Sequence, residues 1–264
     1  MERKSPVATV ESFEALMAQY SCAAAWAIER DGLHTRLNLV PAAFTRNTRG
    51  PFQVHLVLYT DQCPEGIPWV SPKSAFDRDL RIELGAVFGD RFPGGFEGYI
   101  EVIAVSPRQD LRPQHYNELW LDYHADDGRM HVVLPTIQFY GSVKRTLGGQ
   151  SQLWPGLVCT AQNRPSIVTV NPYRETVEFT LTAITPEGGR LPGPTLRLPP
   201  KTQRRWRLDE QLPDIESFLA PSQGIGTLLI NSNYKMVCFF MIENAETGTI
   251  TGGDHLAWFY GENF

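Results

Sequence analysis

The sequence predicts an all-β protein: a tandem duplication of an antiparallel β-sandwich, of jelly-roll or immunoglobulin-like type, with one short N-terminal helix. Three observations support this prediction. The tripeptide Phe-Tyr-Gly occurs at 139–141 and again at 259–261, and the segments before each copy match in order, which indicates a repeat. Apolar and polar residues alternate in runs such as VEFTLTAI at 177–184, as in half-buried strands. Turn-forming residues follow the runs about every 8 to 12 positions, which is typical of sandwiches.

Further matched segments define the expected domains. Because their order is kept throughout, we expect repeats at 23–141 and 155–261 after an N-terminal segment at 1–22. SVKRTLGGQSQLW at 142–154 contains a Gly-Gly pair and positive charge and is the expected linker. The matched pairs are TRLNLVP (35–41) with SIVTVNP (166–172), VHLVLYTDQCPEG (54–66) with FTLTAITPEG (179–188), DLRIELGAVF (79–88) with QRRWRLDEQL (203–212), and GGFEGYIEVIAVSP (94–107) with SQGIGTLLINSN (222–233).

The N-terminal segment contains the expected helix, SFEALMAQY at 12–20. Ser12 is placed to cap the first turn, and Phe13, Leu16 and Met17 share one face at helical spacing. In the second repeat, a group of prolines cannot donate backbone hydrogen bonds and therefore indicates an edge strand. These prolines are at 192, 194, 199 and 200.

The stretch ELWLDYHADDGRMHVVLP at 118–135 predicts a β-hairpin. The Asp-Gly pair at 127–128 is a two-residue turn signal, and it sets a register in which His124 faces His131. Asp122 lies one step further along the same polar face. Opposed Cβ atoms are about 4.5 to 5.5 Å apart, so two imidazoles can share a divalent metal ion. Asp122, His124 and His131 are the predicted metal ligands; the alternative is a solvated polar face, since a first-row metal requires three or four ligands.

Other polar and aromatic candidates are less specific. Trp69 lies among prolines in the predicted loop DQCPEGIPWVSPKSAF at 61–76, where an indole can stack on a sugar ring; the alternative is packing across the junction of the repeats. Asp254 and His255 are adjacent and therefore point to opposite faces of a strand, so we do not expect them to share a catalytic site.

In the second repeat, the predicted hairpin places Asn244 and Thr251 where the first repeat has its two histidines, so the metal site would be confined to the first repeat. RRWR at 204–207 offers cations for phosphate contacts. A strand here would turn Trp206 inward and the flanking arginines toward water, which favours a solvated face.

Charge and cysteine content limit the function classes. The formal net charge is -5, which argues against nucleic acid and anionic membranes as partners. Neither a signal-peptide pattern nor an apolar run of transmembrane length is present, so we expect a soluble, cytoplasmic protein. The four cysteines form no CxxC pair, which favours reduced, buried thiols over a zinc site or disulfides.

Features of a small sandwich recur in the second half, at 166–189, at 196–212 and in the strand around 236–248. They are an Asn that closes a strand, an alternating strand after a polar turn, and a Leu-Pro segment before a basic strand. In these features the second half resembles the soluble sensory rhodopsin transducers, a family of small cytosolic β-sandwich proteins. The resemblance implies an oligomeric, non-enzymatic module that binds a partner or a small ligand.

We therefore expect a non-catalytic binding or interaction module for a protein partner or a small ligand such as a carbohydrate, without a cofactor. The alternative is a metal-dependent enzyme of jelly-roll type that uses the face of Asp122, His124 and His131. The apolar run LAWFYGENF at 256–264 predicts a homo-oligomer in which Trp258 and Phe259 close the interface, unless these side chains complete the second core.

Overall fold

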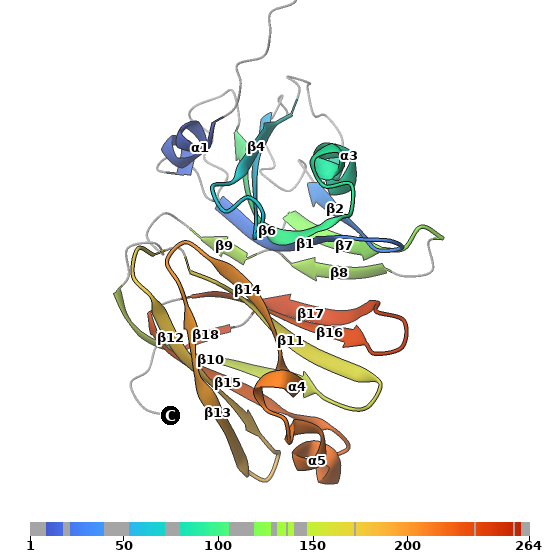
Figure 1. Ribbon diagram of the computed structural model, residues 1–264, viewed down its shortest axis with the longest axis vertical. Helices are drawn as coiled ribbons and strands as arrows, with labels where there is room; N and C mark the ends of the chain where they lie inside the picture. The colour runs from blue at the N-terminus through green and yellow to red at the C-terminus, as the bar shows by residue number, and fades with distance from the viewer. Residues whose placement is uncertain are drawn as a thin grey trace, which may run out of the picture. The chain divides into compact units, whose positions relative to one another are not determined.

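The chain divides into two compact units, Met1–Ser142 (unit 1) and Val143–Phe264 (unit 2), in the computed structural model (Figure 1). Both units consist of antiparallel sheets with few, short helices, so the fold class predicted from the sequence is confirmed. Within the part of the chain that the structure describes, no helix is long and apolar enough to cross a membrane. The described residues are 9–17, 22–39, 53–71, 80–105, 119–127, 131–135, 137–139, 147–171, 173–234, 236–255 and 257–259.

Unit 1 contains a five-stranded and a four-stranded sheet. Their inward side chains form one apolar core, to which Ala25 and Leu56 contribute from the first sheet and Leu37 and Leu121 from the second. The strand orders are β4-β3-β6-β1-β9 and β5-β2-β7-β8. The strands are β1 (Cys22–Glu29), β2 (His34–Leu39), β3 (Gln53–Thr60), β4 (Ile67–Val70), β5 (Leu80–Glu83), β6 (Phe96–Val105), β7 (Leu119–His124), β8 (His131–Pro135) and β9 (Ile137–Phe139).

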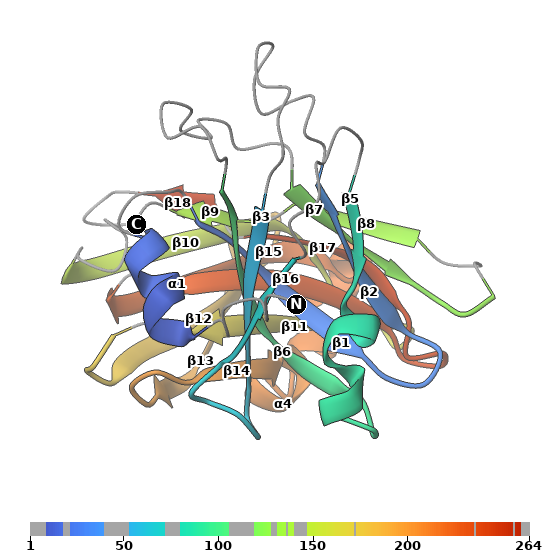
Figure 2. The ribbon, with the colours of Figure 1, turned by 90° about the horizontal axis from the view of Figure 1, so that it is seen from above.

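The helices of unit 1 are short. Helix α1 (Val10–Met17) contacts β3 and β4 and lies to the left of β3 in Figure 2. Its first turn is capped by Thr9, because the Ser12 N–H donates to Thr9 Oγ1 at 3.1 Å and the Thr9 N–H donates to Ser12 Oγ at 3.2 Å. The expected cap, Ser12, is therefore the returning partner of a reciprocal box, not the cap itself. Helix α3 (Leu84–Phe88) and the 3-10 turn η1 (Gly89–Arg91) follow β5.

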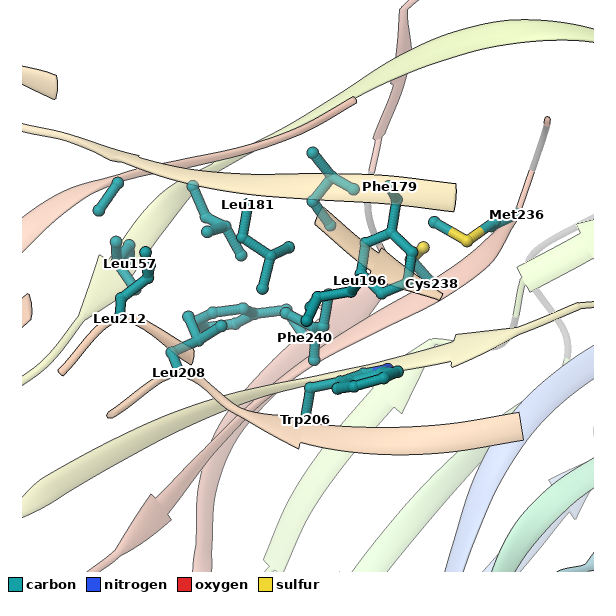
Figure 3. Close-up of a cluster of buried hydrophobic side chains, with 14 of the residues drawn as sticks. Leu157, Phe179, Leu181, Leu196, Trp206, Leu208, Leu212, Met236, Cys238 and Phe240 are labelled. Atoms are coloured by element: carbon teal, nitrogen blue, oxygen red, sulfur yellow. The ribbon is translucent and has the colours of Figure 1, made fainter. Parts of the chain in front are cut away.

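Unit 2 is a second sandwich with its own core. Figure 3 shows Phe179 and Leu181 pointing toward Phe240 and Trp206 across the gap between the sheets. The strand orders are β13-β12-β15-β10-β18 and β14-β11-β16-β17. The elements are β10 (Leu147–Val158), β11 (Asn163–Val170), β12 (Val177–Ile184), β13 (Arg190–Leu198), β14 (Gln203–Arg207), α4 (Leu208–Gln211), α5 (Ile215–Leu219), η3 (Ala220–Ser222), β15 (Ile225–Tyr234), β16 (Val237–Asn244), β17 (Ile250–His255) and β18 (Ala257–Phe259).

The two units have the same topology. Each strand of unit 1 has a counterpart in unit 2 with the same place in the chain and the same sheet neighbours, from β1 and β10 to β9 and β18. The short helix after β5 also recurs after β14. Strands β9 and β18 end at Phe139 and Phe259, the first residues of the two Phe-Tyr-Gly copies; the tyrosines and glycines of these copies lie outside the described residues.

The structure corrects two expectations about elements. Residues 147–154 of the expected linker belong to strand β10, and the Gly148-Gly149 pair lies where the pairing of β10 with β15 shifts register. Glycines at such an irregularity relieve a bulge and do not need to mark a flexible connection. The helices α3, α4 and α5 were not expected, because segments of four or five residues are too short to show a helical period.

Candidate functional site

A pocket of about 330 Å³ lies at the end of unit 1 where β1 and β3 finish and β6 begins. We call it the end pocket. Antiparallel pairing brings these strand ends together, since Glu29 lies opposite Phe96 and Thr60 lies opposite Gly98. The lining residues are Ile28, Glu29, Arg30, Thr60, Asp61, Gln62, Phe92, Gly94, Gly95, Phe96 and Glu97.

Two turns shape the end pocket. In the first, Gly95 has φ +84°, and a Cβ there would lie 2.2 Å from the backbone oxygen of Glu29, so only glycine fits without a shift. In the second, the Thr60 and Cys63 backbones donate to each other at 3.4 and 3.1 Å, which leaves Asp61 exposed at the tip. The local sequence thus sets both rims of the end pocket.

The lining combines hydrogen-bond acceptors with an aromatic base. The acidic lining residues are Glu29, Asp61 and Glu97, and Arg30 is the one cationic residue among the described lining residues. The Trp26 Nε1–H donates to Glu97 Oε1 at 2.7 Å and fixes that carboxylate. Two largely buried phenylalanines, Phe92 and Phe96, belong to the unit 1 core and pack against each other with ring centroids 5.3 Å apart.

Glu29 also belongs to a second group of polar residues, which we call the histidine cluster: Glu29, His34, Arg36, Glu83, His124 and Asp126. Glu29 Oε1 accepts from the Thr35 backbone N–H at 2.7 Å, and Oε2 lies 3.0 Å from His34 Nδ1. His34 Nε2 lies 2.7 Å from Asp126 Oδ1. Because each ring nitrogen faces a carboxylate oxygen, both nitrogens donate when the ring is protonated, as an imidazolium.

Electrostatics agree with that protonation state. Burial acts to lower the pKa of His34, but its hydrogen bonds to Glu29 and Asp126 outweigh burial and raise the pKa above 6.5. Burial acts to raise the pKa of the Glu83 carboxyl, and its hydrogen bonds from Arg36 and His124 outweigh that effect and lower it. The histidine cluster therefore holds charged partners in place.

His124, the second histidine of the cluster, contacts Glu83 and the ring of His34. His124 Nε2 lies 3.1 Å from Glu83 Oε2, and Glu83 Oε1 accepts from Arg36 Nε at 2.5 Å. The rings of His34 and His124 are 5.5 Å apart between centroids, because these residues are opposed in the β2–β7 ladder. The hairpin pattern predicts His131 and Asp122 as neighbours of His124, and His34 is an additional one.

The predicted register of that hairpin is confirmed, since His124 pairs with His131 and Leu121 pairs with Leu134. The side chain of His131 lies outside the described residues. Asp122 is opposite Val133 on one side and Arg36 on the other. Among the residues that the structure describes, no group of three or more His, Cys, Asp or Glu side chains is arranged to hold a metal ion. The metal site of Asp122, His124 and His131 stays a prediction.

The sequence alignment predicts Asn244 as the counterpart of His124 in unit 2, and the structure shifts this counterpart by one residue. Tyr123 is buried and His124 is on the outer face of β7, whereas Phe240 and Ile242 of β16 pack on the core of unit 2. Glu243, not Asn244, therefore corresponds to His124. A register irregularity in the β16–β17 pairing after Ile242 displaced the sequence alignment.

The structure shows how two further candidates pack, whereas a ligand contact of Trp69 stays a prediction. Trp69 lies on strand β4, not in a loop; it is half-buried, is opposite Leu56 and packs against the core of unit 1. Trp206 is inward as expected, but Arg205 does not simply face water, because it donates to Glu243 Oε2 at 2.6 Å and to Ser166 Oγ at 2.9 Å.

Residues near the C-terminus are described only in part. Asp254 and His255 are opposite Phe240 and Phe239, respectively, on consecutive positions of β17. Trp258 and Phe259 belong to β18, whose backbone pairs with β10 in unit 2. The side chains of His255, Trp258 and Phe259 lie outside the described residues, so the predicted dimer contact stays a prediction. Cys22, Cys63, Cys159 and Cys238 form no disulfide, and only Cys63 is not fully buried.

Sequence reasoning missed Glu29 and His34, although a local signal was present. The Asp-Gly pair at 31–32 is the same turn signal that predicted the later hairpin, and the structure has the Arg30–Leu33 bridge around it, with Gly32 at φ +70°. That register places Glu29 beside His34. No local signal points to Glu83 or to the end pocket, since their partners come from distant strands.

Comparisons with known proteins assign no family. No family model matches the chain, and no curated protein matches it. The resemblance to the sensory rhodopsin transducers therefore stays a prediction.

Solved structures that match the chain include a β-glucuronidase from Bacteroides uniformis, with 13% identity and a TM-score of 0.20 over 91% of this chain. A calcium-binding mutant of β-glucuronidase 2 from the same organism has 12% identity and a TM-score of 0.16 over 86% of this chain. The chain spans 26% of the length of either enzyme. Such low TM-scores support no conclusion about fold or function.

Proposed function

We propose that the protein is a non-catalytic binding module whose unit 1 takes a small, hydroxyl-rich ligand, such as a carbohydrate, in the end pocket. The observation that carries the proposal is that three acidic residues and two phenylalanines line one pocket of about 330 Å³. This volume is at the lower end of the range for small-molecule sites, about 300 to 1,000 Å³. It suits one or two sugar rings better than a larger ligand.

The chemistry of the lining fits hydroxyl groups. A carboxylate accepts hydrogen bonds with both oxygens, and such charge-assisted bonds are stronger than neutral ones. Glu97 is already oriented by Trp26, and Glu29 is oriented by His34 and the Thr35 backbone N–H. Preoriented acceptors lower the entropic cost of binding a ligand. Phe92 and Phe96, which are 5% and 7% exposed, form the apolar part of the pocket lining and can contact C–H groups of a sugar.

Binding is favoured over catalysis because two of the three carboxylates have fixed partners. Glu29 accepts from two donors, and Glu97 accepts from an indole N–H. A carboxylate that is tied in this way serves as a fixed acceptor and is poorly suited to shuttle a proton. Asp61, exposed at the rim, is the carboxylate that a ligand can reach most directly.

The test is calorimetric titration of the full chain with a panel of neutral monosaccharides and disaccharides. We expect one of them to bind, and Asp61→Ala to weaken its affinity about tenfold or more, because a hydrogen bond to a charged group contributes about 1.5–3 kcal/mol. Asp90→Ala is the matched control, since Asp90 is exposed nearby in η1 but does not line the end pocket. Saccharide affinity that is equal in the two variants, or no binding across the panel, would refute the proposal.

A further inference from the structure

Two glutamines are buried in the core of unit 2, on strand β10. Gln152 has 0% of its surface exposed and Gln150 has 9%. The Gln152 amide lies beside Met236 and Cys238, which belong to the apolar core cluster. A buried amide is unfavourable unless its donors and acceptors find partners.

In unit 1, the position that corresponds to Gln152 is occupied by an apolar residue. Gln152 is opposite Ile230 in the β10–β15 pair, and Ala23 is opposite Val102 in the corresponding β1–β6 pair. Ala23 packs in the core of unit 1 with 2% of its surface exposed. The shared topology therefore does not require an amide at the position of Gln152.

The hydrogen bonds of the two amides leave one donor and one acceptor open. Gln152 Nε2 donates to the Met236 backbone oxygen at 3.1 Å and to Gln150 Oε1 at 3.4 Å. The Met236 oxygen can only accept, so it fixes the orientation of the Gln152 amide, which in turn fixes that of Gln150. Gln150 Nε2 and Gln152 Oε1 are buried and have no hydrogen-bond partner among the described residues.

We propose that one internal water molecule is bound between Gln150 and Gln152 and completes this amide pair. The water accepts a hydrogen bond from Gln150 Nε2 and donates one to Gln152 Oε1. Gln152 Nε2 and Gln150 Oε1 already bind each other. The remaining two atoms are one donor, Gln150 Nε2, and one acceptor, Gln152 Oε1, and a single water molecule can bind both. This site is distinct from the end pocket and does not depend on the proposed function of unit 1.

The direct test is a high-resolution crystal structure of the full chain, together with water-to-amide cross-relaxation measured by NMR in solution. We expect density for one water within hydrogen-bond distance of both open atoms, and a cross-peak between a long-lived water and the Gln150 side-chain NH₂. Asn171 is the internal control, because its buried Nδ2 donates to the backbone oxygens of Glu175, Leu198 and Pro199, which leaves no donor open for water.

A variant provides the second measurement. Gln152→Met removes the acceptor and is expected to abolish the cross-peak at Gln150 while the signals of Asn171 stay unchanged. The proposal is overturned if the wild-type protein shows neither density nor a cross-peak at this place, or if the cross-peak survives in Gln152→Met.

Discussion

The substitution Gly95→Ala, which adds one methyl group, tests the geometry of the end pocket. Its φ is +84°, in the left-handed region. A Cβ there would lie 2.2 Å from the backbone oxygen of Glu29 and 3.1 Å from its carbonyl carbon. Because these are backbone atoms of β1, no side-chain rotation can relieve the contact. We expect Gly95→Ala to destabilise the protein and to distort the end pocket.

The size of the effect follows from two contributions. A left-handed φ costs an L-residue about 1–2 kcal/mol. Displacing the backbone of β1 to relieve the overlap adds about 1–3 kcal/mol, as for other overpacked sites. The expected loss in the free energy of unfolding is therefore about 2–5 kcal/mol, a large fraction of the roughly 5–15 kcal/mol of a typical domain.

Gly32→Ala is the matched control for Gly95→Ala. Gly32 also has a positive φ, +70°, but a Cβ there would meet nothing within 4 Å. Gly32→Ala should thus incur only the cost of the φ angle. Equilibrium urea unfolding measures both losses, provided that the m-values agree. Equal losses in the two variants would refute the reasoning, since the contact with Glu29 would then contribute nothing.

Two further predictions concern charged contacts. The pKa of His34 is raised above 6.5 in the folded protein, so its contacts with Glu29 and Asp126 contribute fully at a pH below about 6.5 and are lost as the pH rises through the folded pKa. Thermal unfolding across the neutral range should show this loss in the wild type and not in His34→Asn; parallel pH profiles would contradict it. Arg205→Met should cost about 1–3 kcal/mol by removing a charge-assisted hydrogen bond to Glu243, whose side chain is 24% exposed, and a double variant that also carries Glu243→Met should recover most of the loss, as a double-mutant cycle in urea can establish. A double variant that is no more stable than Arg205→Met would refute the second prediction.

Local patterns in the sequence determined the strand character of both units and the register of one hairpin. The alternation in VEFTLTAI is reproduced by the alternate burial of β12. The Asp-Gly turn placed His124 opposite His131, because a two-residue turn leaves only one pairing for the strands that it joins. The collinear segments determined the shared topology of the two units in the same way, since each segment carries its own strand pattern and turn.

Only the tertiary structure decided which residues form the histidine cluster and the end pocket. His34 meets His124 in the β2–β7 ladder, and Glu83 joins them from β5, through pairings that no turn specifies. The end pocket likewise requires β1, β3 and β6 to end side by side. Turn geometry acts over a few residues, whereas partners that are distant in sequence are selected by burial of the whole core, which no single segment encodes.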